Sequence, residues 1–137
     1  MRLGKRLGYP AFATIPVSAV MLSRVPFVSP QQPLEEVAQM FVAGRTAQVP
    51  VVEDGAPVGV VTREDVVAGL ERSGPHAPIS AAPRHDVVTV TPYDSLADVL
   101  ERLRHSPRAV AVVVDRGAPV GLVTADLLRS YLDQKLA

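Results

Sequence analysis

The side chains that could carry chemistry are few and scattered along the chain. The three histidines, His76, His85 and His105, have no partner at the spacing of a metal site, and a lone histidine is usually a surface or packing residue. Ser18 and Ser80 lie in no nucleophile motif, the glutamates form no acid–base constellation, and no glycine-rich loop could cradle a phosphate. The sequence therefore predicts neither an enzyme nor a metal site.

A hydroxyl and a carboxylate do stand together in the segment Thr62-Arg63-Glu64-Asp65. Apolar residues follow it, so the spacing predicts the start of a helix with a capping box. In that arrangement the threonine hydroxyl accepts from a backbone N–H, and the aspartate reaches back or complements the helix dipole. The matching segment 62 residues later keeps Thr124 but has Leu127 in place of Asp65, with Asp126 one residue earlier. We interpret Asp126 as an exposed acid in the first helical turn.

The composition is that of a small folded protein. The chain has 137 residues, 47% of them hydrophobic, enough for one domain or for two small halves that share a core. Fourteen basic residues balance fourteen acidic ones, which argues against a nucleic-acid binder with a broad basic surface. The absence of cysteine excludes disulfides and favours a cytoplasmic location. No apolar run approaches the roughly 20 residues of a membrane span.

The chain contains an internal duplication. GAPVGVVT at 55–62 returns as GAPVGLVT at 117–124, and residues 16–70 align with 78–132 without a gap, giving 19 identities in 55 positions. The break falls in SGPHAP, which has linker composition. We expect a basic N-terminal segment at 1–11, a first copy at 12–74 and a second at 75–137.

Each copy predicts the same order of elements, β-α-β-β-α. In the first copy VPFVSP is extended, and apolar residues at 34, 37, 38 and 41 follow helical spacing. Two strand-like runs then flank Asp54-Gly55, where glycine supplies a positive φ, and a last helix follows Thr62. Strands such as VAVVV are apolar on both faces and need cover on both. We therefore expect an α/β (α+β) fold in which the two copies pack about a pseudo-twofold axis, with clefts along the seam.

The N-terminal segment allows more than one interpretation. MRLGKRLGYP followed by an apolar stretch has the outline of a secretory signal. However, PVSA at 16–19 recurs as PISA at 78–81, which indicates that this stretch belongs to the folded repeat. The basic start could also form an arm for nucleic acid or an anionic membrane, and we regard that as the weaker interpretation.

At this level of detail the repeat resembles a known family. The pattern V-P-V-V-x-x-G-x-x-V-G-V-V-T-x-x-D, from Val49 to Asp65, is similar to the cystathionine-β-synthase-type (CBS) domain, and the second copy matches it from Val113 to Thr124. Two tandem copies resemble a CBS pair, or Bateman module. The resemblance implies a regulatory module that binds adenosyl ligands, such as AMP, ADP, ATP or S-adenosylmethionine, in the clefts between copies and that often dimerises.

The resemblance also implies which residues line those clefts. Asp65 would accept hydrogen bonds from both ribose hydroxyls, apolar side chains would sandwich the adenine, and Arg108 would meet phosphates. The first site would comprise Thr62, Asp65, Val60, Val87, Val88, Arg108, Ala109 and Val110. The mirror site, without the carboxylate at position 127, would comprise Thr124, Asp126, Val25, Pro26 and Arg45, with Asp126 as a displaced ribose ligand. One site per chain is therefore the expectation.

Two functions remain open from the sequence. The first is an adenosyl-ligand sensor that signals to an unidentified partner protein, and the second is a dimerisation or interaction module with a vestigial pocket. In either case we expect a homodimer, because helix faces carrying Phe41, Leu70, Leu103 and Leu132 would otherwise be exposed.

Overall fold

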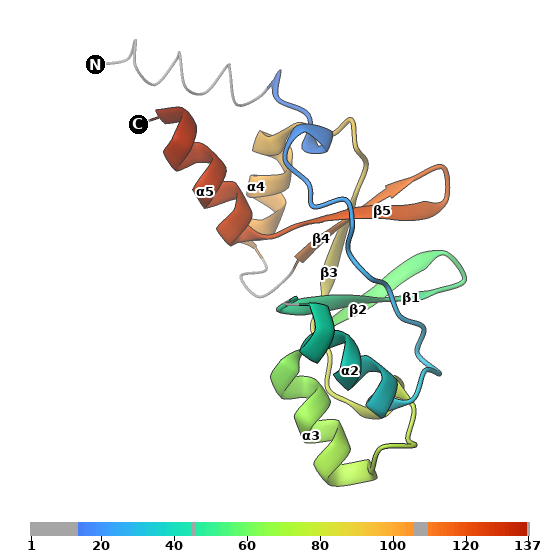
Figure 1. Cartoon of the computed structure of the whole chain (residues 1–137). Coiled ribbons are helices and arrows are strands. Elements are labelled where there is room, and N and C mark those ends of the chain that lie inside the picture. The colour runs from blue at the N-terminus through green and yellow to red at the C-terminus, as the bar shows by residue number, and fades with distance from the viewer. Residues whose placement is uncertain (1–13, 45, 106–109, 137) are drawn as a thin grey trace. The chain divides into compact units, whose positions relative to one another are not determined.

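The structure, a computed structural model, describes residues 14–44, 46–105 and 110–136 (Figure 1). The chain divides into two units: a central unit, Arg24–Val87, and a terminal unit that joins Met1–Ser23 to Val88–Ala137. These units are not the two sequence copies. Each copy gives its opening segment, which includes PVSA or PISA, to the unit that holds the rest of the other copy.

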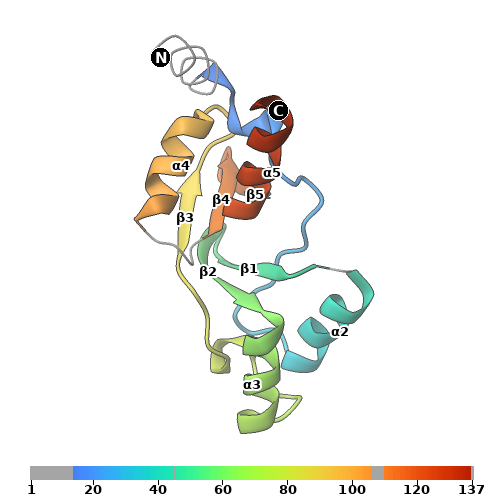
Figure 2. The same cartoon turned by 90° about the vertical axis from the view of Figure 1, so that its left-hand side faces the viewer.

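The central unit holds a β-hairpin and two α-helices. Its elements in chain order are α2 (Leu34–Gly44), β1 (Gln48–Glu53), β2 (Ala56–Thr62), α3 (Arg63–Ser73) and the 3₁₀ helix η2 (Ile79–Ala81). The strands pair antiparallel, with a register shift between Val51 and Val52. Helices α2 and α3 pack side by side against the hairpin (Figures 1 and 2). Strand β2 ends at Thr62 and α3 begins at Arg63, so no loop separates them.

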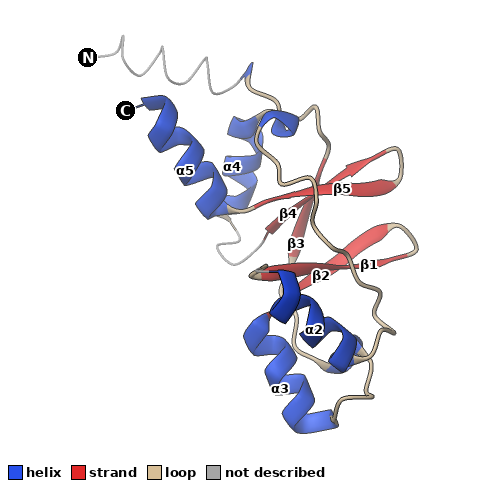
Figure 3. Cartoon of the chain, in the orientation of Figure 1, coloured by secondary structure: helices blue, strands red, loops and turns tan. Residues whose placement is uncertain are grey.

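The terminal unit repeats this plan with one strand more. Its elements are η1 (Val17–Ala19), β3 (Val87–Val90, of which Val87 is the last residue of the central unit), α4 (Leu96–Arg104), β4 (Val110–Asp115), β5 (Ala118–Val123) and α5 (Ala125–Leu136). The strands form one sheet in the order β3-β4-β5, in which β4 and β5 pair antiparallel (Figure 3). The mixed α and β repeat predicted from the sequence is therefore confirmed.

The two hairpin turns are built alike. Both central residues of each turn have positive φ: 53° and 80° at Asp54-Gly55, and 54° and 79° at Arg116-Gly117. This geometry is typical of the two-residue turns that suit the twist of paired strands. The prediction that glycine supplies a positive φ there is confirmed. The first position also takes a left-handed conformation, which Arg116 adopts although L side chains rarely do so.

Each unit has its own core of aliphatic side chains. In the central unit Leu34, Val37 and Phe41 of α2 pack with strand valines and with Ile79 of η2. In the terminal unit the matching helix α4 packs around Val17 of η1. Phe41 and Leu103 are buried in these cores, so the expectation that they form an exposed face was wrong. Helical spacing identified their face correctly, but that face contacts the chain's own sheet.

One predicted strand is reduced to a single pairing. VPFVSP was expected to be extended like VVTVTP, yet only Val28 pairs, with Val51. Val28 donates to the Pro50 oxygen (3.1 Å) and accepts from the Val52 N–H (2.8 Å). Prolines stand at positions 26 and 30 and have no N–H to donate, so pairing cannot extend from Val28. The matching VVTV has no proline and forms β3.

The repeated PVSA and PISA segments have equivalent structures. Val17 and Ile79 are both buried at the start of a 3₁₀ helix. The Val17 N–H donates to the Asp94 oxygen (2.8 Å), and 62 residues later the Ile79 N–H donates to the Gln32 oxygen (2.7 Å). The prediction that PVSA belongs to the folded repeat is confirmed. Within the part of the chain that the structure describes, no helix is long and apolar enough to cross a membrane.

Candidate functional site

The candidate site begins where β2 continues directly into α3. Thr62 is extended and caps the helix: its Oγ1 accepts from the Asp65 N–H at 3.3 Å. In return Oδ2 of Asp65 accepts from the Thr62 N–H at 2.8 Å. The capping box predicted from the sequence is therefore confirmed. It fixes the Asp65 carboxylate over the N-terminal end of α3, where backbone N–H groups and the helix dipole favour negative charge.

A second partner of Asp65 comes from a distant part of the chain. His85 lies beside β2 and pairs with Val60 through both backbone groups: its N–H donates to the Val60 oxygen (2.9 Å), and its oxygen accepts from the Val60 N–H (3.0 Å). This pairing directs the imidazole to the helix start, where Nε2 lies 3.1 Å from Oδ2 of Asp65. Asp65 is 8% exposed, and among the described residues it is the charged side chain that is buried with the apolar ones. The interpretation of His85 as an isolated side chain is therefore wrong.

A glycine permits the close approach of the 84–85 segment to β2. A Cβ atom built on Gly59 would lie 2.8 Å from Cδ of Arg84 and 3.3 Å from the His85 oxygen. A side chain at 59 would therefore force the Arg84 side chain to move and would crowd the His85 carbonyl. Gly121 has the same role in the terminal unit, where a Cβ would meet Met21 and Leu22 at 2.8–3.1 Å.

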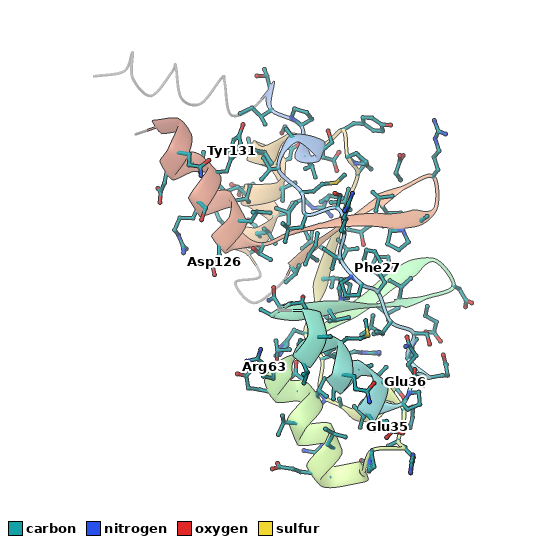
Figure 4. The ribbon with its side chains drawn as sticks, viewed as in Figure 1. Phe27, Glu35, Glu36, Arg63, Asp126 and Tyr131 are labelled. Carbon is teal, nitrogen blue, oxygen red and sulfur yellow. The ribbon has the colours of Figure 1, made fainter. Side chains whose placement is uncertain are left out.

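The start of α5 repeats the cap but not the carboxylate. Oγ1 of Thr124 accepts from the Leu127 N–H at 3.0 Å, and the leucine has no group to reciprocate. Leu22 occupies the place of His85 and pairs with Leu122. Asp126 is 91% exposed and pairs with Nη1 of Arg129 at 2.9 Å. Figure 4 labels Asp126 in the first turn of α5 and Arg63 in the corresponding turn of α3.

The structure brings together only part of the predicted first site. Thr62, Asp65 and Val60 form one cluster, to which His85 must be added. Val87 belongs to the same central unit, whereas Val88 and Val110 belong to the terminal unit. Arg108 and Ala109 lie outside the described residues.

The predicted mirror site is divided in the same way. Thr124 and Asp126 belong to the terminal unit, and Val25 and Pro26 to the central unit. Arg45 lies outside the described residues. Among the residues that the structure does describe, no group of three or more histidines, aspartates and glutamates could hold a metal ion.

His85 was missed because no local sequence signal links it to Asp65. The ungapped alignment of the copies places Arg84, not His85, opposite Leu22. The two crossing segments leave their 3₁₀ turns differently. The Met21 N–H extends the first turn by donating to the Val17 oxygen, whereas Pro83 at the matching position has no N–H. The pairing residue is one position later in the second segment, which puts an imidazole where the repeat predicts an arginine.

Comparison with known proteins agrees with this architecture. The family model of the CBS domain matches residues 17–72 and 79–133. The CBS domain-containing protein YhcV of Bacillus subtilis is 28% identical over 109 residues, which cover 78% of each chain.

Two solved structures show the same fold. The CBS domain of a bacterial CNNM/CorC family Mg²⁺ transporter, in complex with ATP, superposes with a TM-score of 0.79 at 20% identity and covers 96% of each chain. The CBS domain pair of protein MJ0100, in complex with 5′-methylthioadenosine and S-adenosyl-L-methionine, has a TM-score of 0.72 at 19% identity and covers 89% of this chain and 98% of that one. From the two family matches and this shared fold, the chain belongs to the CBS domain family and carries two CBS domains in tandem.

Proposed function

We propose that this CBS pair is a regulatory module that binds an adenosyl ligand, with Asp65 as the acceptor for the ribose hydroxyls. The observation that carries the proposal is a buried carboxylate fixed at the N-terminus of α3 by the Thr62 cap. Structural relatives bound to ATP, 5′-methylthioadenosine and S-adenosylmethionine support the choice of ligand class. These ligands share an adenosine moiety, so the ribose is the group that a common acceptor would recognise.

The chemistry of the helix start suits such a ligand. A carboxylate has two oxygens and can accept from two adjacent hydroxyls at once, and such charge-assisted hydrogen bonds are about twice as strong as neutral ones. Backbone N–H groups at the N-terminus of α3 favour an anionic group nearby. In this proposal Val60, Val87, Val88, Ala109 and Val110 contact the adenine, and Arg108 meets the phosphates.

The proposal includes one binding site per chain. The start of α5 offers no buried carboxylate, because Leu127 stands in the place of Asp65. Asp126 is exposed and already paired with Arg129, so it is a poor replacement. A mirror site built from Thr124, Val25, Pro26 and Arg45 would lack the acceptor that gives the first site its selectivity for ribose.

A second candidate function rests on the same carboxylate. Oδ2 of Asp65 already accepts from the Thr62 N–H and lies against His85, so Asp65 has a structural use without a ligand. The chain could then be a dimerisation or interaction module with a vestigial pocket. Its contact surface would include the large apolar side chains that remain exposed, among them Val42 (87%) and Tyr93 (74%).

A ligand panel separates the two functions. Thermal unfolding would be followed with AMP, ADP, ATP, S-adenosylmethionine and NADH, because a ligand that binds only the folded state raises Tm. The sensor proposal expects a concentration-dependent rise with at least one adenosyl compound, and calorimetry should then give about one ligand per chain. No shift with any compound would favour the interaction module. Light scattering on the same samples tests the proposed homodimer, which a monomer mass at tens of micromolar would contradict.

A further inference from the structure

We infer that His85 is an internal competitor for Asp65: its imidazole contacts the carboxylate in the ligand-free protein and is displaced when an adenosyl ligand binds. This inference rests on the proposed function of Asp65 and adds a residue that sets its affinity. The observation behind it is the 3.1 Å contact between Nε2 of His85 and Oδ2 of Asp65.

The carboxylate of Asp65 can accept only a limited number of hydrogen bonds. A carboxylate has about four lone-pair sites, two on each oxygen. Both described contacts of the Asp65 side chain use the same oxygen: the Thr62 N–H at 2.8 Å and the His85 imidazole at 3.1 Å. Oδ2 therefore accepts one backbone hydrogen bond and lies against the imidazole before any ligand arrives. A ribose that places one hydroxyl on each carboxylate oxygen must approach Oδ2, and there it competes with the imidazole for space beside that atom.

The imidazole is the partner that can leave. Giving up the Thr62 N–H would break one half of the capping box of α3 and leave a backbone donor without an acceptor. The His85 side chain is 30% exposed and can rotate towards solvent, whereas its backbone stays fixed by two hydrogen bonds to Val60. Displacement therefore costs one side-chain contact and leaves the fold in place.

The test measures affinity in variants that differ only at the imidazole. His85→Ala removes the competitor and keeps the backbone pairing. His85→Gln keeps an N–H donor at about the distance of Nε2. His76→Ala is the matched control, because His76 also faces a carboxylate of the central unit, Oε1 of Glu35 at 3.3 Å, but does not contact Asp65. Binding of AMP, ATP and S-adenosylmethionine would be measured by calorimetry, and thermal unfolding would confirm that each variant is folded.

The expected result is that His85→Ala tightens Kd by roughly three- to tenfold, the change expected when one competing polar contact is removed. His85→Gln should bind within about twofold of the wild type, as should His76→Ala. Weaker binding by His85→Ala would overturn the inference and make the imidazole a ligand contact. Equal binding would also overturn it. In both cases the wild type still binds, so the proposed function stands. If neither the wild type nor any variant binds, the proposed function and the inference both fail.

Discussion

The starts of α3 and α5 are the same structure built twice with different chemistry. Both follow a strand without a loop, and both are capped by a threonine hydroxyl that accepts from the backbone three residues later. In α3 the third residue is Asp65, which reciprocates and pairs with His85. In α5 it is Leu127, and the residue facing β5 is Leu22. Because α5 begins without a reciprocating carboxylate, a helix start of this kind does not require one.

The largest expected effect concerns the segments that cross between the copies. A chain shortened to begin at residue 22 should lose cooperative unfolding, since it lacks Val17, which is fully buried in the core of the terminal unit. Burial of one valine side chain contributes about 1.5–3 kcal/mol, and the backbone bonds of the segment to Pro92 and Asp94 are lost as well. Differential scanning calorimetry provides the measurement.

Ser18→Ala is the matched control for that deletion. Its side chain is exposed, and its backbone N–H still donates to the Pro92 oxygen. Its melting transition should therefore stay close to that of the wild type. An unchanged Tm after the deletion would contradict the structural role of the segment and restore the interpretation of the N-terminus as a targeting signal.

The next effect compares the stabilities of the two caps. Thr62→Ala should cost up to about 2 kcal/mol in unfolding free energy, because it removes the hydroxyl acceptor and loosens the reciprocal bond of Asp65. Thr124→Ala should cost about 1 kcal/mol, since only one hydrogen bond is lost. Urea denaturation followed by circular dichroism gives both values. Equal losses would show that the carboxylate adds nothing to the cap.

A smaller effect should appear in the coupling of Asp65 and His85. A double-mutant cycle with Asp65→Asn and His85→Ala in the ligand-free protein should give a coupling of about 1 kcal/mol, which is typical of a partly buried polar pair. Asp126→Ala, which removes the exposed pair with Arg129, should change stability by no more than about 0.5 kcal/mol. Zero coupling in the cycle would mean that the imidazole does not hold the carboxylate in solution.

The sequence predicted the features that depend on neighbours along the chain. The hairpin turns, the capping box at Thr62 and the helical faces all follow from local spacing, and the turns and helical faces occur in both copies. The sequence could not show which segment of the chain packs against each apolar helix face. Phe41 and Leu103 are apolar at the right spacing, but only the fold shows that their partners lie within the same chain.

The contact between His85 and Asp65 depends on features that no local pattern reports. It needs a segment of the second copy to cross β2 of the first, Gly59 to admit it, and Pro83 to alter the exit from the preceding turn. Each of these is a tertiary or register effect, and a shift of one residue would have placed Arg84 at the site instead. The same limit applies to the short pairing at Val28. Two prolines nearby have no N–H to donate, so the β-forming residues around them do not extend the strand.

The central claim is that Asp65, and not Asp126, binds the ligand. Calorimetry with AMP and ATP on the wild type, Asp65→Ala and Asp126→Ala tests it most directly. We expect about one ligand per chain in the wild type, and at least a tenfold weaker Kd in Asp65→Ala, because the lost hydrogen bonds to a charged group are each worth roughly 1.5–3 kcal/mol and about 1.4 kcal/mol is tenfold. Asp126→Ala should bind like the wild type. Wild-type affinity in Asp65→Ala together with lost binding in Asp126→Ala would contradict the account and move the site to the other copy.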